Sequence, residues 1–198
     1  MTTIIKPGIE RILKIFYRID KIHLRAISRE TNMYGQSVTR YLNELEKEKI
    51  LKSKKEGNLK IYSWDKNNKV YSIKTLFDLE RLEKLPFQRK EAIKGYIKML
   101  PEKPVFAILF GSTAKNNFSK DSDIDILIVT NNKFSSKEAE KEVDTIYGIK
   151  MSTFQISYKE FIKELKLKED KVVQSAILTG YPIFNNNYYY EVLDNERI

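Results

Sequence analysis

Two aspartates that lie one residue apart, Asp123 and Asp125, are the side chains of this sequence best suited to chemistry. They open an apolar run that predicts a buried strand. Side chains alternate along a strand, so both carboxylates are expected on one face while Ile124 and Ile126 point into the core. Neighbouring carboxylates repel each other unless a cation lies between them. Hard oxygen ligands suit Mg²⁺ or Mn²⁺, with substrate phosphates completing the shell, so the spacing predicts a divalent metal site.

A second short segment has the residue types of a phosphate site. An apolar strand is predicted at 105–110, and it ends at Gly111 and Ser112. Glycine lets the backbone approach a phosphate closely, and Ser112 offers a hydroxyl and an N–H group at a predicted helix start. Lys115 adds a positive charge. An Asp-rich turn before an ordinary core strand is the simpler alternative, but such a turn does not require Gly-Ser after the preceding strand.

The order of these residues resembles a known signature. A hydrophobic residue followed by Gly111-Ser112, a loop, and Asp123-Ile124-Asp125 is similar to the DNA polymerase β-like nucleotidyltransferases, above all the minimal nucleotidyltransferases of archaea and bacteria. The likeness extends over residues 85–190. It implies a mixed sheet flanked by helices, a nucleoside triphosphate ligand, Asp123 and Asp125 as catalytic metal ligands, and Gly111, Ser112 and Lys115 as the nucleotide-binding residues.

The resemblance also implies a third carboxylate on a neighbouring strand, which completes a two-metal site. Its expected position falls near Ser152, and no Asp or Glu occurs between residues 145 and 159. A serine hydroxyl is a weak neutral ligand and a weak base at neutral pH. Asp121 is a further acid nearby, but its place suits a turn. We therefore expect magnesium-nucleotide binding, with catalysis less well supported.

The first 66 residues predict three helices and a hairpin. The helices are expected at 8–19, 23–31 and 36–49, and the strands at 50–56 and 59–64, joined by Gly57-Asn58. A core is expected from Ile9, Ile12, Leu13, Phe16, Ile19, Leu24, Ile27, Val38, Leu42 and Leu45. The only histidine, His23, is expected to cap or pack at the start of the second helix.

This arrangement resembles the winged helix-turn-helix of archaeal and bacterial transcription regulators, in which the third helix enters the major groove and the wing touches the backbone. The residues then expected to face double-stranded DNA are Tyr34, Gln36, Ser37, Thr39, Arg40 and Asn43, with Lys52, Lys54, Lys55 and Lys60 on phosphates. A solvated charged face or a protein-docking module is the alternative.

The distribution of charge agrees with a polyanionic partner. The chain carries a net charge of +9, and residues 1–66 hold most of that excess. The sequence has no cysteine and no apolar run long enough to cross a bilayer. Its first residues are soon interrupted by Pro7, so we expect no signal peptide. We expect a cytoplasmic protein with no membrane partner.

The remaining elements complete an α+β prediction. Helices are expected at 70–85, 87–100, 137–147, 158–167 and 172–179, a strand at 149–157, a tight return at 180–184 and a tail at 185–190. In the helix at 137–147, Ala139, Val143 and Ile146 are expected to face inward. The predicted domains are a winged helix-turn-helix at 1–66, a helical connector at 67–104 whose apolar stripe suggests a homodimer, and a nucleotidyltransferase domain at 105–198.

The function predicted from these parts is a DNA-binding transcriptional regulator whose second domain binds a magnesium nucleotide. The alternative is an active nucleotidyltransferase that moves a nucleoside monophosphate onto a small molecule or a protein hydroxyl, and that acts as an antitoxin on a toxin-type partner.

Overall fold

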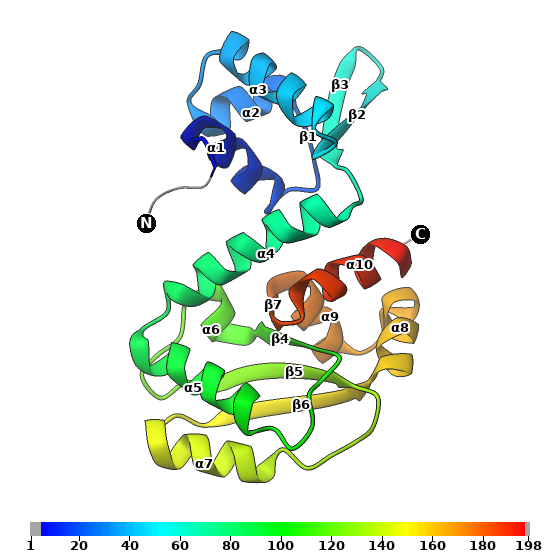
Figure 1. Ribbon diagram of the computed structural model, residues 1–198. Helices are drawn as coiled ribbons and strands as arrows, with labels where there is room; N and C mark the ends of the chain where they lie inside the picture. Colours follow the sequence, from blue (N-terminus) through cyan, green and yellow to red (C-terminus); the bar gives the residue numbers. More distant parts are fainter. Residues whose placement is uncertain (1–4, 197–198) are drawn as a thin grey trace. The chain divides into compact units, whose positions relative to one another are not determined.

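The computed structural model describes residues 5–196, and these form two compact units that divide between Phe77 and Asp78. Each unit has its own hydrophobic core, and each is described by itself (Figure 1). Helix α4, Asn68–Glu83, contains the boundary: Phe77 is buried in the core of the first unit and Asp78 is buried in the second.

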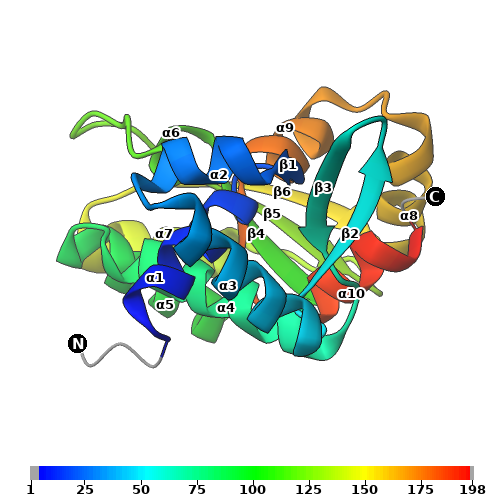
Figure 2. The same cartoon turned by 90° about the horizontal axis from the view of Figure 1, so that it is seen from above.

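The first unit is a winged helix. Its elements follow in the order α1 (Pro7–Phe16), β1 (Lys21–His23), α2 (Leu24–Thr31), α3 (Gly35–Lys47), β2 (Leu51–Glu56) and β3 (Leu59–Trp64). The strands form an antiparallel sheet in the order β1-β3-β2. In Figure 2 the hairpin of β2 and β3 is seen extended beside α3. The short strand β1 was not expected from the sequence, because three residues carry too little periodicity to predict a strand.

Local signals fix the helix-turn-helix. His23 caps α2, because its Nδ1 accepts a hydrogen bond of 3.2 Å from the Ala26 amide. Asn32 ends α2 in the left-handed region at φ 51°. Trp64 closes the unit by donating its indole N–H to the Phe16 carbonyl at 2.9 Å. The expected core is confirmed with one correction: α1 ends at Phe16, so Ile19 lies beyond the helix and is 40% exposed.

The second unit is built on a mixed sheet in the order β6-β5-β4-β7. Its elements after α4 are α5 (Phe87–Met99), β4 (Phe106–Phe110), α6 (Gly111–Lys115), β5 (Ile124–Thr130), α7 (Lys137–Tyr147), β6 (Met151–Ser157), α8 (Tyr158–Leu167), α9 (Lys171–Thr179), β7 (Tyr181–Phe184) and α10 (Asn186–Glu196). Strands β5 and β6 are parallel, and the other pairs are antiparallel. The fold class is therefore α+β, as predicted.

The sheet is covered on both faces (Figure 1). Helices α5 and α7 pack on the face that carries Ile124 and Ile126 of β5, with Ile93 and Val143 in that core. On the opposite face the Phe106 ring meets the rings of Phe161 in α8 and Tyr189 in α10 at 5.0 and 5.4 Å. Alternation along β4 and its pairing with β5 place Asp125 on this second face, near the start of β5 and opposite the last residue of β4.

Two predictions about the C-terminal part are wrong. The segment expected as a tight return is strand β7, and the segment expected as a tail belongs to helix α10. Pro182 is tolerated because β7 is an edge strand that pairs with β4 beside a register shift. Helix α10 is held by buried Asn186, which donates to the Pro182 carbonyl at 2.8 Å and to Asp78 at 3.1 Å.

Helix α5 belongs to the core of the second unit. Its stripe of Ala92, Ile93 and Tyr96 is buried under the sheet, so this stripe is not an open face for a homodimer. The predicted limits at residues 66 and 104 differ from the division after residue 77, because the last six residues of α4 and all of α5 belong to the second unit.

A smaller correction concerns α7, where Ile146 is 54% exposed and so does not join Ala139 and Val143 in the core. In the part of the chain that the structure describes, no helix combines the length and the apolar character needed to cross a membrane.

Candidate functional site

The candidate nucleotide site is centred on Asp125, which lies between two neighbouring strands. Asp125 is directly opposite Phe110 on β4 and opposite Ser152 on β6. Burial raises the pKa of Asp125, the hydroxyl of Ser152 opposes this by hydrogen bonding to the carboxylate, and the negative charge of Asp123 raises the pKa further. A half-buried carboxylate with a second carboxylate beside it is a site that a cation would stabilise.

Gly111 lies directly against this carboxylate. Its φ is +67°, and a Cβ built on it would come within 1.9 Å of Oδ2 of Asp125. Every other residue type would therefore collide with the carboxylate and strain the backbone. Gly111 begins the short helix α6, in which Ser112 is half-buried and Lys115 is exposed. The structure thus brings Gly111 and Asp125 together, as the sequence motif implied.

Asp123 is exposed and lies just before β5, two residues from Asp125 and so on the same face. Asp121 is also exposed, but it belongs to the turn closed by the Ser122 amide and the Ser119 carbonyl at 3.2 Å. Among the described residues, Asp121 is not grouped with Asp123 and Asp125 as a third metal ligand.

The strand position expected for a third carboxylate carries a hydroxyl. Ser152 is the direct neighbour of Asp125 across the parallel β5–β6 pair, and it is exposed. Thr153 and Gln155 point to the other face, where the Thr153 hydroxyl meets the Tyr96 hydroxyl at 2.6 Å. Within residues 5–196, no three His, Cys, Asp or Glu side chains are grouped so as to hold a metal ion.

The residues present fit one divalent cation that shares its shell with phosphates. Asp123 and Asp125 supply hard oxygen ligands from the same face at the start of β5. They do not supply the ligand set of two metal ions held by three carboxylates.

A functional residue that the sequence analysis missed is Arg89 on α5. Its side chain is 4% exposed and donates hydrogen bonds to Thr113 of α6 and to two carbonyls of the loop before Asp123. Arginine is rarely buried, so its type predicts exposure. The available signal was its position, since Arg89 lies on the same helical stripe as Ala92, Ile93 and Tyr96.

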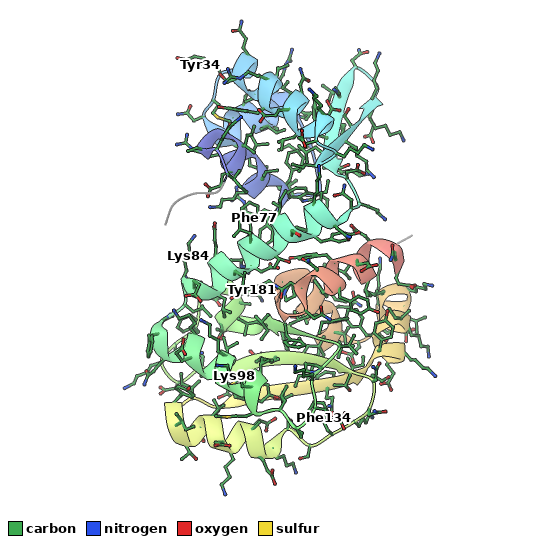
Figure 3. All side chains as sticks on the ribbon, in the orientation of Figure 1. Tyr34, Phe77, Lys84, Lys98, Phe134 and Tyr181 are labelled. Atoms are coloured by element: carbon green, nitrogen blue, oxygen red, sulfur yellow. The ribbon has the colours of Figure 1, made fainter. Side chains whose placement is uncertain are left out.

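The candidate nucleic-acid face of the first unit is a polar strip on α3. Tyr34, just before the helix, is 88% exposed, and Figure 3 shows it at the outer end of the unit. The strip continues along α3 with the exposed residues Gln36, Thr39, Arg40 and Asn43, and with half-buried Ser37. The opposite side of the helix buries Val38, Leu42 and Leu45.

The four lysines predicted on the wing divide into two groups. Lys54 and Lys55 are exposed near the tip of the hairpin. Lys60 is paired with Glu46 at 2.7 Å and lies over the ring of Tyr62, and Lys52 approaches Asp65 at 3.9 Å. Lys52 and Lys60 therefore have partners within the unit, and Glu46 also accepts a hydrogen bond from Ser53.

Comparison with solved structures gives distant likenesses. ZitR of Lactococcus lactis, a zinc-responsive MarR family member, has a TM-score of 0.30 and 15% identity, covering 50% of this chain and 75% of its own. ZitR in complex with DNA gives 0.30 and 14%, covering 50% and 74%. TrmBL2, an archaeal chromatin protein, gives 0.30 and 13%, covering 87% and 70%. Likenesses of this degree establish neither a shared fold nor a shared function.

Comparison with curated proteins gives no match. The family model for polymerase beta nucleotidyltransferases matches residues 91–189, which is half of the chain and contains β4, α6, β5 and β6 with Gly111, Asp123 and Asp125. The matched region and the geometry around Asp125 agree, and the chain therefore belongs to the polymerase beta nucleotidyltransferase family.

Proposed function

We propose that the protein is a DNA-binding transcriptional regulator whose nucleotidyltransferase unit binds a magnesium nucleotide as a ligand. The observation that carries the proposal is the pairing of Asp125 with Ser152 across β5 and β6. Two adjacent carboxylates suffice for binding a metal-nucleotide, whereas a hydroxyl in the third position removes the group that would activate an attacking hydroxyl.

In this proposal Asp123 and Asp125 hold the divalent ion, which nucleotidyltransferases of this family generally use. When bound, Mg²⁺ neutralises the charge of the triphosphate. The missing side chain at Gly111 lets the Asp125 carboxylate lie against the backbone at the start of α6. In the proposal this backbone, the Ser112 hydroxyl and the Lys115 ammonium group bind the phosphate oxygens. Lysine contributes here as a point charge.

The first unit provides the proposed contact with double-stranded DNA. The exposed strip of α3 presents amide, hydroxyl and guanidinium groups that suit base edges, and Lys54 and Lys55 suit phosphates. Lys52 and Lys60 also contact phosphates in this proposal, once DNA phosphates replace Asp65 and Glu46 as their partners. The excess positive charge of residues 1–66 predicts affinity that falls steeply with salt.

The test is titration of the protein with ATP and GTP, with and without Mg²⁺, beside the double variant Asp123→Asn, Asp125→Asn. We expect metal-dependent binding by the wild type and its loss in the variant. Titration of duplex DNA in the presence and absence of the nucleotide then shows whether the ligand controls DNA affinity. Equal nucleotide binding by both proteins would contradict the proposal.

An active nucleotidyltransferase is the second candidate, and the intact Gly-Ser and Asp-x-Asp elements favour it. The chain would then transfer a nucleoside monophosphate to a small molecule or to a hydroxyl of a toxin-type partner. Incubation with α-labelled nucleotide, Mg²⁺ or Mn²⁺, and cell extract tests this. Label transfer that requires Asp123 and Asp125 would establish an enzyme.

We also propose that the protein is a homodimer, since regulators of palindromic DNA sites carry matching two-fold symmetry. Light scattering of the full chain gives the mass directly, and a monomer at all concentrations would exclude it.

A further inference from the structure

A buried arginine beneath the nucleotide site has a role that the proposed function does not assign. Arg89 of α5 is 4% exposed, and it precedes the residues matched by the family model. Placing a guanidinium group away from water is costly unless all its donors find acceptors. Its partners therefore show what the side chain holds in place.

The guanidinium group joins three parts of the site. Nη1 donates to the Thr113 hydroxyl of α6 at 2.9 Å. Nη2 donates to the carbonyls of Ser119 and Ser122 at 3.0 and 2.6 Å. The Thr113 hydroxyl in turn donates to the carbonyl of Asp123 at 3.5 Å. The start of α6 at Gly111 and Ser112 is called the phosphate-binding turn below. Arg89 thus connects this turn with the backbone that carries Asp123.

The loop itself is shaped around this side chain. The Phe118 ring lies against the guanidinium group at 4.2 Å, and the Ser122 hydroxyl accepts from the Ser119 amide at 2.9 Å. The carbonyl oxygens of Ser119 and Ser122 both point at the guanidinium group, and without its positive charge these two oxygens would repel each other. The loop conformation before Asp123 therefore depends on Arg89.

The charge of Arg89 also acts on Asp123. Burial lowers the pKa of Arg89, and the nearby negative charge of Asp123 opposes that change. The guanidinium group remains charged at all physiological pH values. It therefore attracts the Asp123 carboxylate before any metal binds.

A second arginine supports α6 from its other end. Nη2 of Arg81 donates to the Ala114 carbonyl at 3.0 Å, and the guanidinium group lies 3.9 Å from the centre of the Tyr181 ring. Arg81 and Arg89 both precede the first residue matched by the family model, and both contact α6 or the loop that follows it.

We infer that Arg89 is a positioning residue that holds the loop, the phosphate-binding turn and Asp123 in the arrangement that accepts a metal-nucleotide. The inference rests on the proposed nucleotide binding for its functional half. The structural half, the holding of the loop, stands without it.

Hydrogen exchange tests the structural half. The amides of Ser119 and Ser122 are hydrogen-bonded within the loop, and we expect Arg89→Met to speed their exchange about tenfold or more. Amides within β5 should keep their exchange rates. Lys98→Met is the matched control, because Lys98 is an exposed cation on the same helix (Figure 3). Unchanged exchange in folded Arg89→Met would overturn the inference.

The functional half is tested by the ratio of ATP affinity with Mg²⁺ to ATP affinity in EDTA, measured at a temperature where every variant is folded. A general loss of stability would not change this ratio, whereas displacement of Asp123 lowers it. We expect a fall of about tenfold in Arg89→Met, little recovery in Arg89→Lys because an ammonium group cannot reach all three acceptors, and no change in Lys98→Met.

Thr113→Val provides a second route if Arg89→Met fails to fold, since it removes only the hydroxyl between Arg89 and Asp123. A lower ratio in this variant supports the inference, and a wild-type ratio overturns it. If the wild type itself binds ATP equally with and without Mg²⁺, the proposed function fails while the exchange result still decides the role of Arg89 in the loop.

Discussion

The two units present their candidate binding residues in different ways. In the winged helix, Gln36, Arg40 and Asn43 lie on the outer side of one helix whose inner side forms the core. In the nucleotidyltransferase unit, Gly111 lies against Asp125, and Asp125 is half-buried between Phe110 of β4 and Ser152 of β6. Binding and stability are therefore separable in the first unit and coupled in the second.

The strongest test of this comparison uses two glycines with similar backbone angles. Gly111→Ala would place a methyl group on the Asp125 carboxylate at φ +67°, and we expect a loss of about 3 kcal/mol in the stability of the second unit together with loss of magnesium-nucleotide binding. Gly57→Ala, at φ +57° with nothing within 4 Å, should cost only about 1 kcal/mol. Urea denaturation measures both.

The reverse behaviour is expected on α3. Arg40→Ala removes an exposed guanidinium group and should weaken binding to a DNA target about tenfold with little change in stability. Arg11→Ala removes the same charge from the outer side of α1 and serves as control. Equal DNA affinity of the two variants would show that the strip on α3 is a solvated face or a protein-docking surface.

The wing provides a smaller and more specific effect. Replacing both Lys54 and Lys55 with alanine should lower the dependence of log affinity on log salt by roughly two, because each released phosphate contact contributes about one. Lys60→Ala should change this slope less, since Lys60 must first leave Glu46. Fluorescence anisotropy at several salt concentrations measures the slopes. A larger change for Lys60 would mean that DNA displaces Glu46.

The smallest expected effect concerns an exposed ion-pair cluster away from both sites. Lys90 and Lys94 lower the pKa of Glu83 to about 2 through hydrogen bonds to its carboxylate. A lowered pKa in the folded state gives stability that is present above pH 4.5 and is lost as the pH falls toward 2. In Glu83→Gln the free energy of unfolding should therefore depend slightly less on pH in that range, as measured by circular dichroism. Solvent screening keeps this contribution small.

The parts of the molecule that the sequence predicted are those that depend on local spacing. The apolar positions of α1 and α3 repeat at helical intervals, His23 and Asn32 mark the ends of α2, and the alternation of Asp123 and Asp125 needs only a strand. The site position Ser152 was located through the resemblance to the nucleotidyltransferase signature, and the parallel β5–β6 pair places it directly beside Asp125.

The parts that were missed depend on partners far away in the chain. Asn186 and Tyr190 appear as part of a polar, aromatic tail until Asp78, more than a hundred residues earlier, accepts their hydrogen bonds. From the sequence alone, Arg89 is expected to be an exposed cation. Its burial is explained only by the loop carbonyls that accept its hydrogen bonds in the folded chain. No local pattern carries such pairings, because each residue acquires its role only after the chain has folded.

The contacts of Glu46 have a consequence for the kinetics of DNA association. Glu46 lies on α3 and binds both Ser53 of β2 and Lys60 of β3, so the helix and the hairpin are joined before any DNA arrives. An already ordered wing loses little further conformational freedom on contact with a duplex. Association should then proceed in a single step at a rate set by diffusion and electrostatic attraction, without a slow ordering phase in stopped-flow traces. Cutting the connection with Glu46→Ala, which removes both acceptor oxygens, would introduce that phase and lower the association rate.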